Sequence, residues 1–283
     1  MARVIDGKAI ASEVRSEVAG EVRELRESEH RVRLDVVLVG ENPASVTYVR
    51  NKERDCAEVG IESRVHRFPE DVPQKELARL VESLNEDPEV SGFFVQLPLP
   101  PGLDDLALIS AIDPAKDVDG LSPASAGRLA VGLPSFQPCT PHGVIQLLKR
   151  SGIEVSGREA VVLGRSNLVG KPMAQLFLKE NATVTVCHSR TRDLPEAASR
   201  ADILVAAIGQ REMIGVEHVK EGAVVVDVGI HRREGPDGGL IGDVKYGEVE
   251  PRASAITPVP GGVGPMTRAM LLHNTLAAAR MRA

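Results

Sequence analysis

Tyr48 and Lys52 lie four residues apart in a stretch that predicts a helix over residues 44–58, so their side chains share one face of it. They flank the apolar arc that carries Val49 and Cys56. A lysine at the border of an apolar face is partly desolvated, which lowers its pKa and lets the neutral amine act as a base. The same spacing is also typical of an aromatic ring beside the amphipathic stem of a lysine, without catalysis.

Two further polar residues could serve the same chemistry. Gln96 falls near the end of a strand predicted over residues 90–97, at the carboxyl end where open α/β sheets bind ligands, and could orient a lysine. Asp119, in the run Asp117-Val118-Asp119-Gly120, could accept hydrogen bonds from an amino-substituted heterocycle. Without any function, Gln96 could simply be a polar residue at the end of a strand, and Asp119 could belong to an Asp-Gly turn.

A second candidate site lies in residues 160–173, which predict a buried strand, a glycine turn and the start of a helix. Gly164 permits a tight turn, and the helix that opens at Gly170 is expected to leave unpaired backbone amides for an anion. Only two glycines of the familiar GxGxxG pattern remain, because Arg165 and Ser166 stand where another would be. An ordinary strand-to-helix corner is the alternative interpretation.

The next predicted strand, residues 182–187, ends where an NAD enzyme usually places an acidic residue for the ribose hydroxyl. Here the chain continues His188-Ser189-Arg190-Thr191-Arg192, and a carboxylate comes only at Asp193. Hydroxyl and guanidinium donors suit an additional phosphate, which favours NADP over NAD. Taken alone, this stretch is also typical of a solvated basic loop.

The elements that must position these residues fall into two halves of alternating strands and helices. Each half predicts an α/β layer with a mainly parallel sheet, the second one Rossmann-like. Between them, residues 98–141 contain eight prolines, and their apolar residues show no sustained helical or strand spacing. This indicates a domain joint with loops that line a cleft. The first half has strands expected over 34–39, 64–68 and 90–97 and helices over 10–25, 44–58 and 77–84; the second has strands over 160–163, 182–187, 203–208 and 223–228 and helices over 141–149 and 266–281.

Composition narrows the class of protein. The 283 residues are 42% hydrophobic and 26% charged, as expected for a globular chain long enough for two domains. A net charge of −6 argues against a general binder of nucleic acid or anionic membranes. Three widely spaced cysteines predict reduced thiols and no metal site, and the first residues lack the apolar run of a signal peptide, so a cytoplasmic location is expected.

Taken together, these motifs closely resemble the bifunctional methylenetetrahydrofolate dehydrogenase and methenyltetrahydrofolate cyclohydrolase family. The resemblance extends over essentially the whole chain, and its last motif is very specific. It rests on residues 45–52 (SVTYVRNK), 95–100 (VQLPLP), 116–121 (KDVDGL), 138–141 (PCTP), 164–172 (GRSNLVGKP) and 258–267 (PVPGGVGPMT).

The resemblance implies a homodimer whose subunits have two α/β domains flanking a cleft. Residues 1–120 would bind folate, with the helix 266–283 packing back onto them, and residues 121–265 would form a Rossmann-like NADP-binding domain. The reaction would oxidise 5,10-methylenetetrahydrofolate with NADP to the methenyl cation and hydrolyse that to 10-formyltetrahydrofolate, a step of one-carbon metabolism that supplies purine biosynthesis.

The family pattern also implies roles for individual residues. Lys52 would be the general acid/base, Tyr48 would stack on the substrate, Gln96 would support the lysine and Asp119 would hold the pterin ring. The full substrate-binding set would be Tyr48, Lys52, Gln96, Leu97, Asp119, Pro260 and Gly261. The cofactor set would be Gly164, Arg165, Ser166, Ser189, the backbone of Ile230, Thr140 and Thr267, with Thr267 near the nicotinamide.

Three alternatives stay open at the level of sequence. The chain could be an NADP-dependent dehydrogenase of a different small acid, because this architecture hosts many reactions. It could be a nucleotide-sensing module without turnover, or a family member that has kept only one of the two activities. The resemblance implies a folate substrate, and the net charge of −6 argues against a nucleic-acid or membrane partner.

Overall fold

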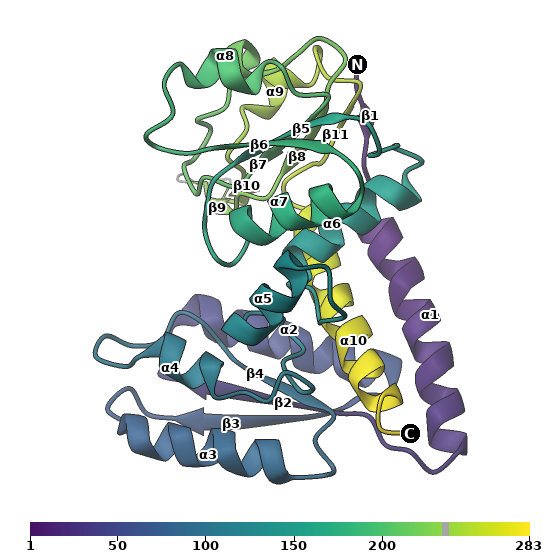
Figure 1. The fold of residues 1–283 in the computed structure, drawn as a ribbon, viewed down its shortest axis with the longest axis vertical. Helices are drawn as coiled ribbons and strands as arrows, with labels where there is room; N and C mark the ends of the chain where they lie inside the picture. The colour runs from purple at the N-terminus through teal and green to yellow at the C-terminus, as the bar shows by residue number, and fades with distance from the viewer. Residues whose placement is uncertain (234–237) are drawn as a thin grey trace. The chain divides into compact units, whose positions relative to one another are not determined.

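The computed structural model describes residues 1–233 and 238–283, which divide into two compact units (Figure 1). Unit 1 comprises Met1–Ala11 and Thr140–Thr267, and unit 2 comprises Ser12–Cys139 and Arg268–Ala283. Three helices cross from one unit into the other along the chain. They are α1 (Gly7–Glu27), α6 (Cys139–Arg150) and α10 (Val263–Arg280).

Unit 2 is built on a parallel sheet of strand order β3-β2-β4, with every residue of β2 buried. One sheet face packs its valines and phenylalanines against apolar residues of α3, while α2 lies on the other side (Figure 1). The strands are β2 (Arg33–Val39), β3 (Glu62–Phe68) and β4 (Gly92–Val95), and the helices are α2 (Pro43–Val59), α3 (Gln74–Glu86), α4 (Asp105–Ser110) and α5 (Pro123–Ala130).

Helix α2, which carries the candidate lysine, has a strong signal at each end. The Asn42 side chain accepts hydrogen bonds from the amides of Ala44 and Ser45, and Pro43 occupies the first turn, where no amide partner is lost. Gly60 ends the helix in the left-handed conformation, at φ 83°. The predicted helix over 44–58 is therefore confirmed to within one residue at either end.

Unit 1 contains, among its described residues, a parallel sheet of strand order β1-β11-β8-β7-β5-β6. The chain moves outward from β5 to β6 and then returns to β7 on the opposite side of β5, so the order reverses at the carboxyl end of β5. Such a switch point is where open α/β sheets bind ligands. The strands are β1 (Arg3–Val4), β5 (Glu159–Leu163), β6 (Thr183–Cys187), β7 (Ile203–Ala206), β8 (Val224–Asp227) and β11 (Ala255–Ile256).

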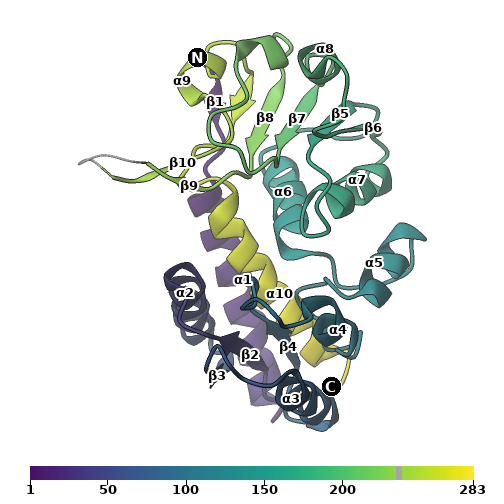
Figure 2. The same ribbon diagram turned by 90° about the vertical axis from the view of Figure 1, so that its left-hand side faces the viewer.

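Short elements complete unit 1. Helices α7 and α8 follow β5 and β6 along the chain, and β9 and β10 form a small antiparallel pair that projects from the sheet (Figure 2). Their bounds are α7 (Gly170–Lys179), α8 (Leu194–Ala198), the 3₁₀ turn η1 (Val216–His218), β9 (His231–Arg232), β10 (Leu240–Ile241) and α9 (Tyr246–Val249).

The predicted class, two α/β domains with a Rossmann-like second domain, is confirmed, but three stretches differ from expectation. Residues 98–141 are more than loops, because α4 and α5 form there behind the capping side chains of Asp104 and Ser122. Residues 1–11 belong to unit 1, because the amides of Arg3 and Ile5 donate to Ser254 and Ile256 beside β11. Residues 121–139 belong to unit 2.

The assignment of a ligand to each domain stays a prediction. Among residues 1–233 and 238–283, no helix combines the length and the apolar character needed to cross a bilayer.

Candidate functional site

Lys52 and Gln96 meet in unit 2. Lys52 Nζ donates a hydrogen bond to Gln96 Oε1 at 3.2 Å and lies 3.9 Å from the centre of the Phe94 ring. Gln96 follows β4 directly, and its amide nitrogen Nε2 donates to the carbonyl of Leu97 at 2.6 Å. Because this contact turns the amide nitrogen of Gln96 toward Leu97, the amide oxygen of Gln96 faces the amine of Lys52.

The environment of Lys52 favours the neutral amine. Burial removes water from the ammonium group and lowers the pKa of Lys52, and this effect outweighs the negative charge of Asp119, which acts in the opposite direction. The Phe94 ring also attracts the charged form. A lowered pKa raises the fraction of neutral amine, which is the form that a general base requires.

Two buried thiols, Cys56 and Cys139, also interact electrostatically with Lys52. Burial raises the pKa of Cys56 to about 12, and it raises the pKa of Cys139 well above its usual range. Both groups therefore stay protonated at neutral pH, and Cys139 points its sulfur at the carbonyl of Val118, at 3.6 Å. They act as small apolar side chains and do not compete with the amine as nucleophiles.

Asp119 is half-buried in a turn that its neighbour Asp117 organises. The Asp117 carboxylate accepts hydrogen bonds from the amides of Gly120 and Ser122 and from the Ser125 hydroxyl, at 2.6–3.1 Å. Burial raises the pKa of Asp117 despite these donors. The turn leaves Asp119 close enough to Lys52 for their charges to interact.

The two remaining predicted residues of unit 2 differ in exposure. Tyr48 lies one turn before Lys52 on α2 and is 42% exposed, so its ring is available to a planar ligand. Leu97 is half-buried and precedes a cis proline peptide. The structure therefore brings Lys52, Gln96 and Asp119 together, with Tyr48 on the same helix.

In unit 1, the glycine turn after β5 is as tight as the sequence suggested. Gly164 has φ +125°, and a Cβ added there would lie 2.2 Å from the carbonyl oxygen of Ala207. A Cβ at Gly170 would lie 2.2 Å from the carbonyl oxygen of Gly164. Both positions thus exclude a side chain, and the backbone of the turn stays open for close approach by a ligand.

One expectation about this turn is wrong in part. The amides at the start of α7 are not simply unpaired, because the Ser166 hydroxyl accepts hydrogen bonds from Val169 and Gly170, at 3.1 and 3.4 Å. A serine three residues ahead of these amides can cap them locally. Arg165 and Ser166 are both exposed on the turn, where an anion could contact them.

The loop after β6 lies beside this turn, because Leu163 at the end of β5 is paired with Cys187 at the end of β6. Ser189, Arg190 and Arg192 are exposed on the loop. Asp193 is engaged in capping α8, where its carboxylate accepts from the amide of Glu196. Hydroxyl and guanidinium groups therefore stand where an NAD enzyme usually has a carboxylate, which fits the extra phosphate of NADP.

The other predicted cofactor residues also belong to unit 1. Ile230 follows β8 by three residues and is 45% exposed. Thr140 and Thr267 join their hydroxyls in a 2.9 Å hydrogen bond. Pro260 and Gly261, which the family pattern assigns to the substrate, are also part of unit 1; Gly261 is buried with φ +107°, and Pro260 beside it is exposed.

Sequence reasoning missed Asp243, a fully buried residue near the same end of the sheet. Its carboxylate accepts hydrogen bonds from the amides of Ile208 and Gly209 and contacts His231 Nε2 at 2.8 Å. It thereby ties the loop after β7 to the segment after β8. No local pattern marks this role, because the partners lie 12 to 35 residues away.

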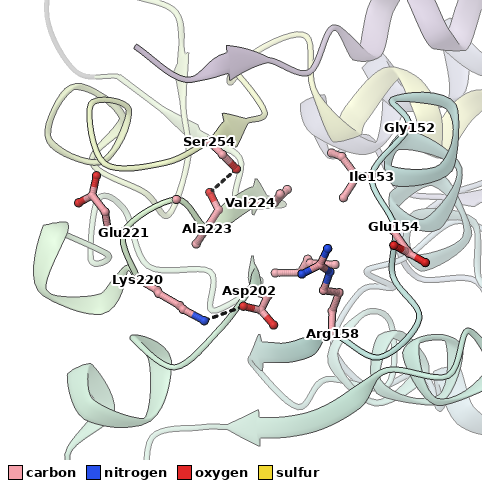
Figure 3. A pocket seen from close by; sticks show the side chains of 12 residues that line it. Gly152, Ile153, Glu154, Arg158, Asp202, Lys220, Glu221, Ala223, Val224 and Ser254 are labelled. Atoms are coloured by element: carbon pink, nitrogen blue, oxygen red, sulfur yellow. Dashed lines mark hydrogen bonds and ion pairs between the residues drawn. The ribbon is translucent and has the colours of Figure 1, made fainter.

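A polar hollow of about 400 Å³ lies at the opposite, amino ends of β5, β7 and β8 (Figure 3). Asp202 stands in it, held by Lys220 Nζ at 2.7 Å and by the amide of Glu159 at 3.0 Å. None of the predicted site residues lines this hollow. The candidate chemistry of unit 1 is therefore confined to the carboxyl edge of the sheet.

A parallel sheet with a glycine turn and a basic loop at its switch point places unit 1 in the class of dinucleotide-binding α/β domains. Family models agree with this class. The model "Tetrahydrofolate dehydrogenase/cyclohydrolase, catalytic domain" matches residues 5–119, and "Tetrahydrofolate dehydrogenase/cyclohydrolase, NAD(P)-binding domain" matches residues 138–283. The chain belongs to the tetrahydrofolate dehydrogenase/cyclohydrolase family.

Individual relatives support this assignment over the full length. The chain is 72% identical over 282 residues to Bifunctional protein FolD 1 of Rubrobacter xylanophilus, covering 100% of this chain and 99% of the relative. The crystal structure of the FolD enzyme of Campylobacter jejuni has a TM-score of 0.97 at 45% identity, with 100% of both chains covered. The Trypanosoma brucei FolD structure, described as complexed with NADP cofactor and inhibitor, has a TM-score of 0.94 at 40% identity and covers 99% of this chain and 98% of that one.

Proposed function

We infer that this chain oxidises 5,10-methylenetetrahydrofolate with NADP and hydrolyses the resulting 5,10-methenyltetrahydrofolate to 10-formyltetrahydrofolate. The observation that carries this function is the Lys52–Gln96 pair, a desolvated amine held by an amide oxygen at 3.2 Å, in a chain of the tetrahydrofolate dehydrogenase/cyclohydrolase family. Relatives at 52–72% identity over nearly their whole length are named bifunctional FolD proteins.

In the hydrolytic step, the residues of unit 2 have separate tasks. Neutral Lys52 takes a proton from the water that attacks the cationic methenyl carbon, and a protonated lysine would instead repel that cation. Gln96 aims the amine through its oxygen. Asp119 accepts hydrogen bonds from the amino-substituted pterin ring, and the exposed Tyr48 stacks on the substrate, with Leu97, Pro260 and Gly261 as further contacts.

In the oxidative step, bound NADP would supply the acceptor for the hydride that leaves the one-carbon bridge. The chain's own contribution is alignment, since hydride transfer depends chiefly on holding the two carbons in contact. The donor set fits the cofactor: the Gly164 turn excludes side chains, Arg165 and Ser189 are exposed on neighbouring loops, and the loop after β6 has no carboxylate before Asp193. Ser166, Ile230, Thr140 and Thr267 complete the proposed set.

The function is tested by mixing the purified chain with methylenetetrahydrofolate and NADP and following absorbance over time. Formation of the methenyl species followed by its decay is expected. Formation without decay would identify a dehydrogenase alone, and no formation with this substrate would refute the assignment.

We also infer a homodimer. Support comes from β6, which lies at the margin of the unit 1 sheet with Val186 39% exposed and Thr183 and Thr185 exposed beside it (Figure 2). An unpaired edge strand is a template for association. Light scattering should give twice the chain mass, and Val186→Lys should halve it; a wild-type monomer would refute the dimer.

Location and wider role are likewise proposals. Three free cysteines support a reducing compartment, the cytoplasm, and the net charge of −6 supports a small-molecule enzyme without nucleic-acid or membrane partners. There, 10-formyltetrahydrofolate would supply purine biosynthesis. Fractionation of cells that express a tagged chain tests the location.

A further inference from the structure

Asn274 is a buried residue of α10 whose side-chain nitrogen reaches other parts of unit 2, including the Cys139 sulfur at 3.8 Å. It is 3% exposed, and its Nδ2 donates to the carbonyl of Val118 at 2.8 Å and to the carbonyl of Gln137 at 3.0 Å. An asparagine amide nitrogen has two donors, so this arrangement uses both. Its neighbour Thr275 is equally buried, but the Thr275 hydroxyl donates only to Leu271 of the same helix.

The two carbonyls that Asn274 joins stand directly beside the candidate site. Val118 precedes Asp119, and Gln137 lies two residues before Cys139. The sulfur of Cys139 is in turn directed at the carbonyl of Val118. Asn274 therefore holds together two chain segments, 118–119 and 137–139, and the first of them carries Asp119, whose charge interacts with Lys52.

These segments pack backbone against backbone, so there is little room between them for an added atom. A Cβ at Gly120 would lie 2.7 Å from the carbonyl oxygen of Phe136. Asp117 fixes the turn on the carboxyl side of Asp119 through the amides of Gly120 and Ser122. On the amino side, the carbonyl of Val118 is held by Asn274, so the Asp119 backbone is fixed from both directions.

We propose that Asn274 is a positioning residue for Asp119, which it holds in place to bind the amino-substituted ring of the folate substrate. This inference rests on the proposed function. Asn274 touches no reacting atom, and its effect passes through the Val118 carbonyl. Removing the amide leaves the Val118 carbonyl with only the weak thiol donor of Cys139, and it takes the Asn274 donor from the Gln137 carbonyl, so each segment moves toward a new partner.

The test compares Asn274→Leu with Thr275→Val, two buried, nearly isosteric changes at adjacent positions of one helix. In the intact enzyme, Asn274→Leu should raise KM for methylenetetrahydrofolate and for methenyltetrahydrofolate by about tenfold. This factor corresponds to the loss of one hydrogen bond between the substrate and the charged Asp119. The kcat values and the KM for NADP should stay within about twofold, because only uniform substrate binding is removed. Thr275→Val should leave every constant unchanged.

Asn274→Ser is the second variant, in case Asn274→Leu does not fold. Its smaller side chain leaves room for water to bind both carbonyls. Because water then binds both carbonyls, the rise in KM should be smaller than in Asn274→Leu. In an Asp119→Ala background, either change at Asn274 should have no additional effect on KM.

An unchanged KM in both variants, or an equal effect with and without Asp119, would overturn the proposal. The wild-type constants are measured alongside. If the wild type turned over neither folate, the proposed function would fail instead, which separates the two inferences.

Discussion

Replacing Gln96 by glutamate tests directly whether a neutral Lys52 drives hydrolysis. The change keeps the size of the side chain and places a negative charge about where Oε1 now stands, 3.2 Å from Lys52 Nζ. Coulomb's law gives an attraction of about 1.3 kcal/mol at the dielectric constant of water and about 5 kcal/mol at an effective value near 20. Each step of about 1.4 kcal/mol reduces the fraction of neutral amine tenfold while the ammonium form dominates.

The expected result follows from the sign of this effect. A carboxylate favours the ammonium form and raises the pKa of Lys52 from its lowered value, so hydrolysis in Gln96→Glu should need a higher pH. At pH 7, decay of the methenyl species should slow by about tenfold or more. In the wild type, the rate should rise with pH as Lys52 loses its proton and should then level off, because the base is active only when neutral.

The assay is the pH profile of kcat for methenyl hydrolysis, corrected for the spontaneous reaction. Gln96→Met is the matched control, because it removes the acceptor oxygen without adding charge. Its rate should fall, but the rising limb of its profile should not move to higher pH. A profile for Gln96→Glu that coincides with the wild type would refute the role of neutral Lys52.

Three further outcomes are expected. Lys52→Met should reduce methenyl hydrolysis by a factor of about 10² to 10⁴, with a smaller effect on dehydrogenation; normal cyclohydrolase turnover in stopped assays would contradict the base assignment. Arg165→Ala should reduce the preference for NADP over NAD by about 10- to 100-fold in kcat/KM, and an unchanged ratio would exclude a contact with the extra phosphate. Gly164→Ala puts a Cβ 2.2 Å from the Ala207 carbonyl oxygen and should lower the free energy of unfolding. The loss should be about 1–3 kcal/mol larger than for Gly152→Ala, because Gly152 also has a positive φ but no atoms within 4 Å of an added Cβ. Equal urea midpoints for the two variants would argue against the tight turn.

Much of this architecture could be predicted from the chain, because its main signals are local. The apolar run 160–163 gives a buried strand, and Asn42, Pro43 and Gly60 mark both ends of the helix that carries Lys52. The meeting of Lys52 with Gln96 followed from placing one residue on a helix and the other at a strand end. Helix α5 was missed although its start carries a capping serine and a proline, since eight residues are too few to show a period.

What could not be predicted depends on contacts between distant residues. Strand β1 is two residues long and exists only because Arg3 and Val4 pair with Ala255 and Ile256. Asn274 is one of several polar residues in α10, and its partner Val118 lies 156 positions away. A single buried amide of this kind becomes visible only when its acceptors are known.

The interleaving of the two units has a consequence for biosynthesis. Residues 3 and 4 leave the ribosome early, yet the strand they join is completed only when Ala255 and Ile256 have been translated. Unit 2 likewise cannot be completed until the segment from Arg268 onward has been translated. That segment contains Asn274 and Arg268, the ion-pair partner of Asp55. Neither half of the nascent chain can therefore reach its finished form before synthesis is almost complete, and a polypeptide cut at the junction near residue 139 would leave both fragments without a part of their own cores.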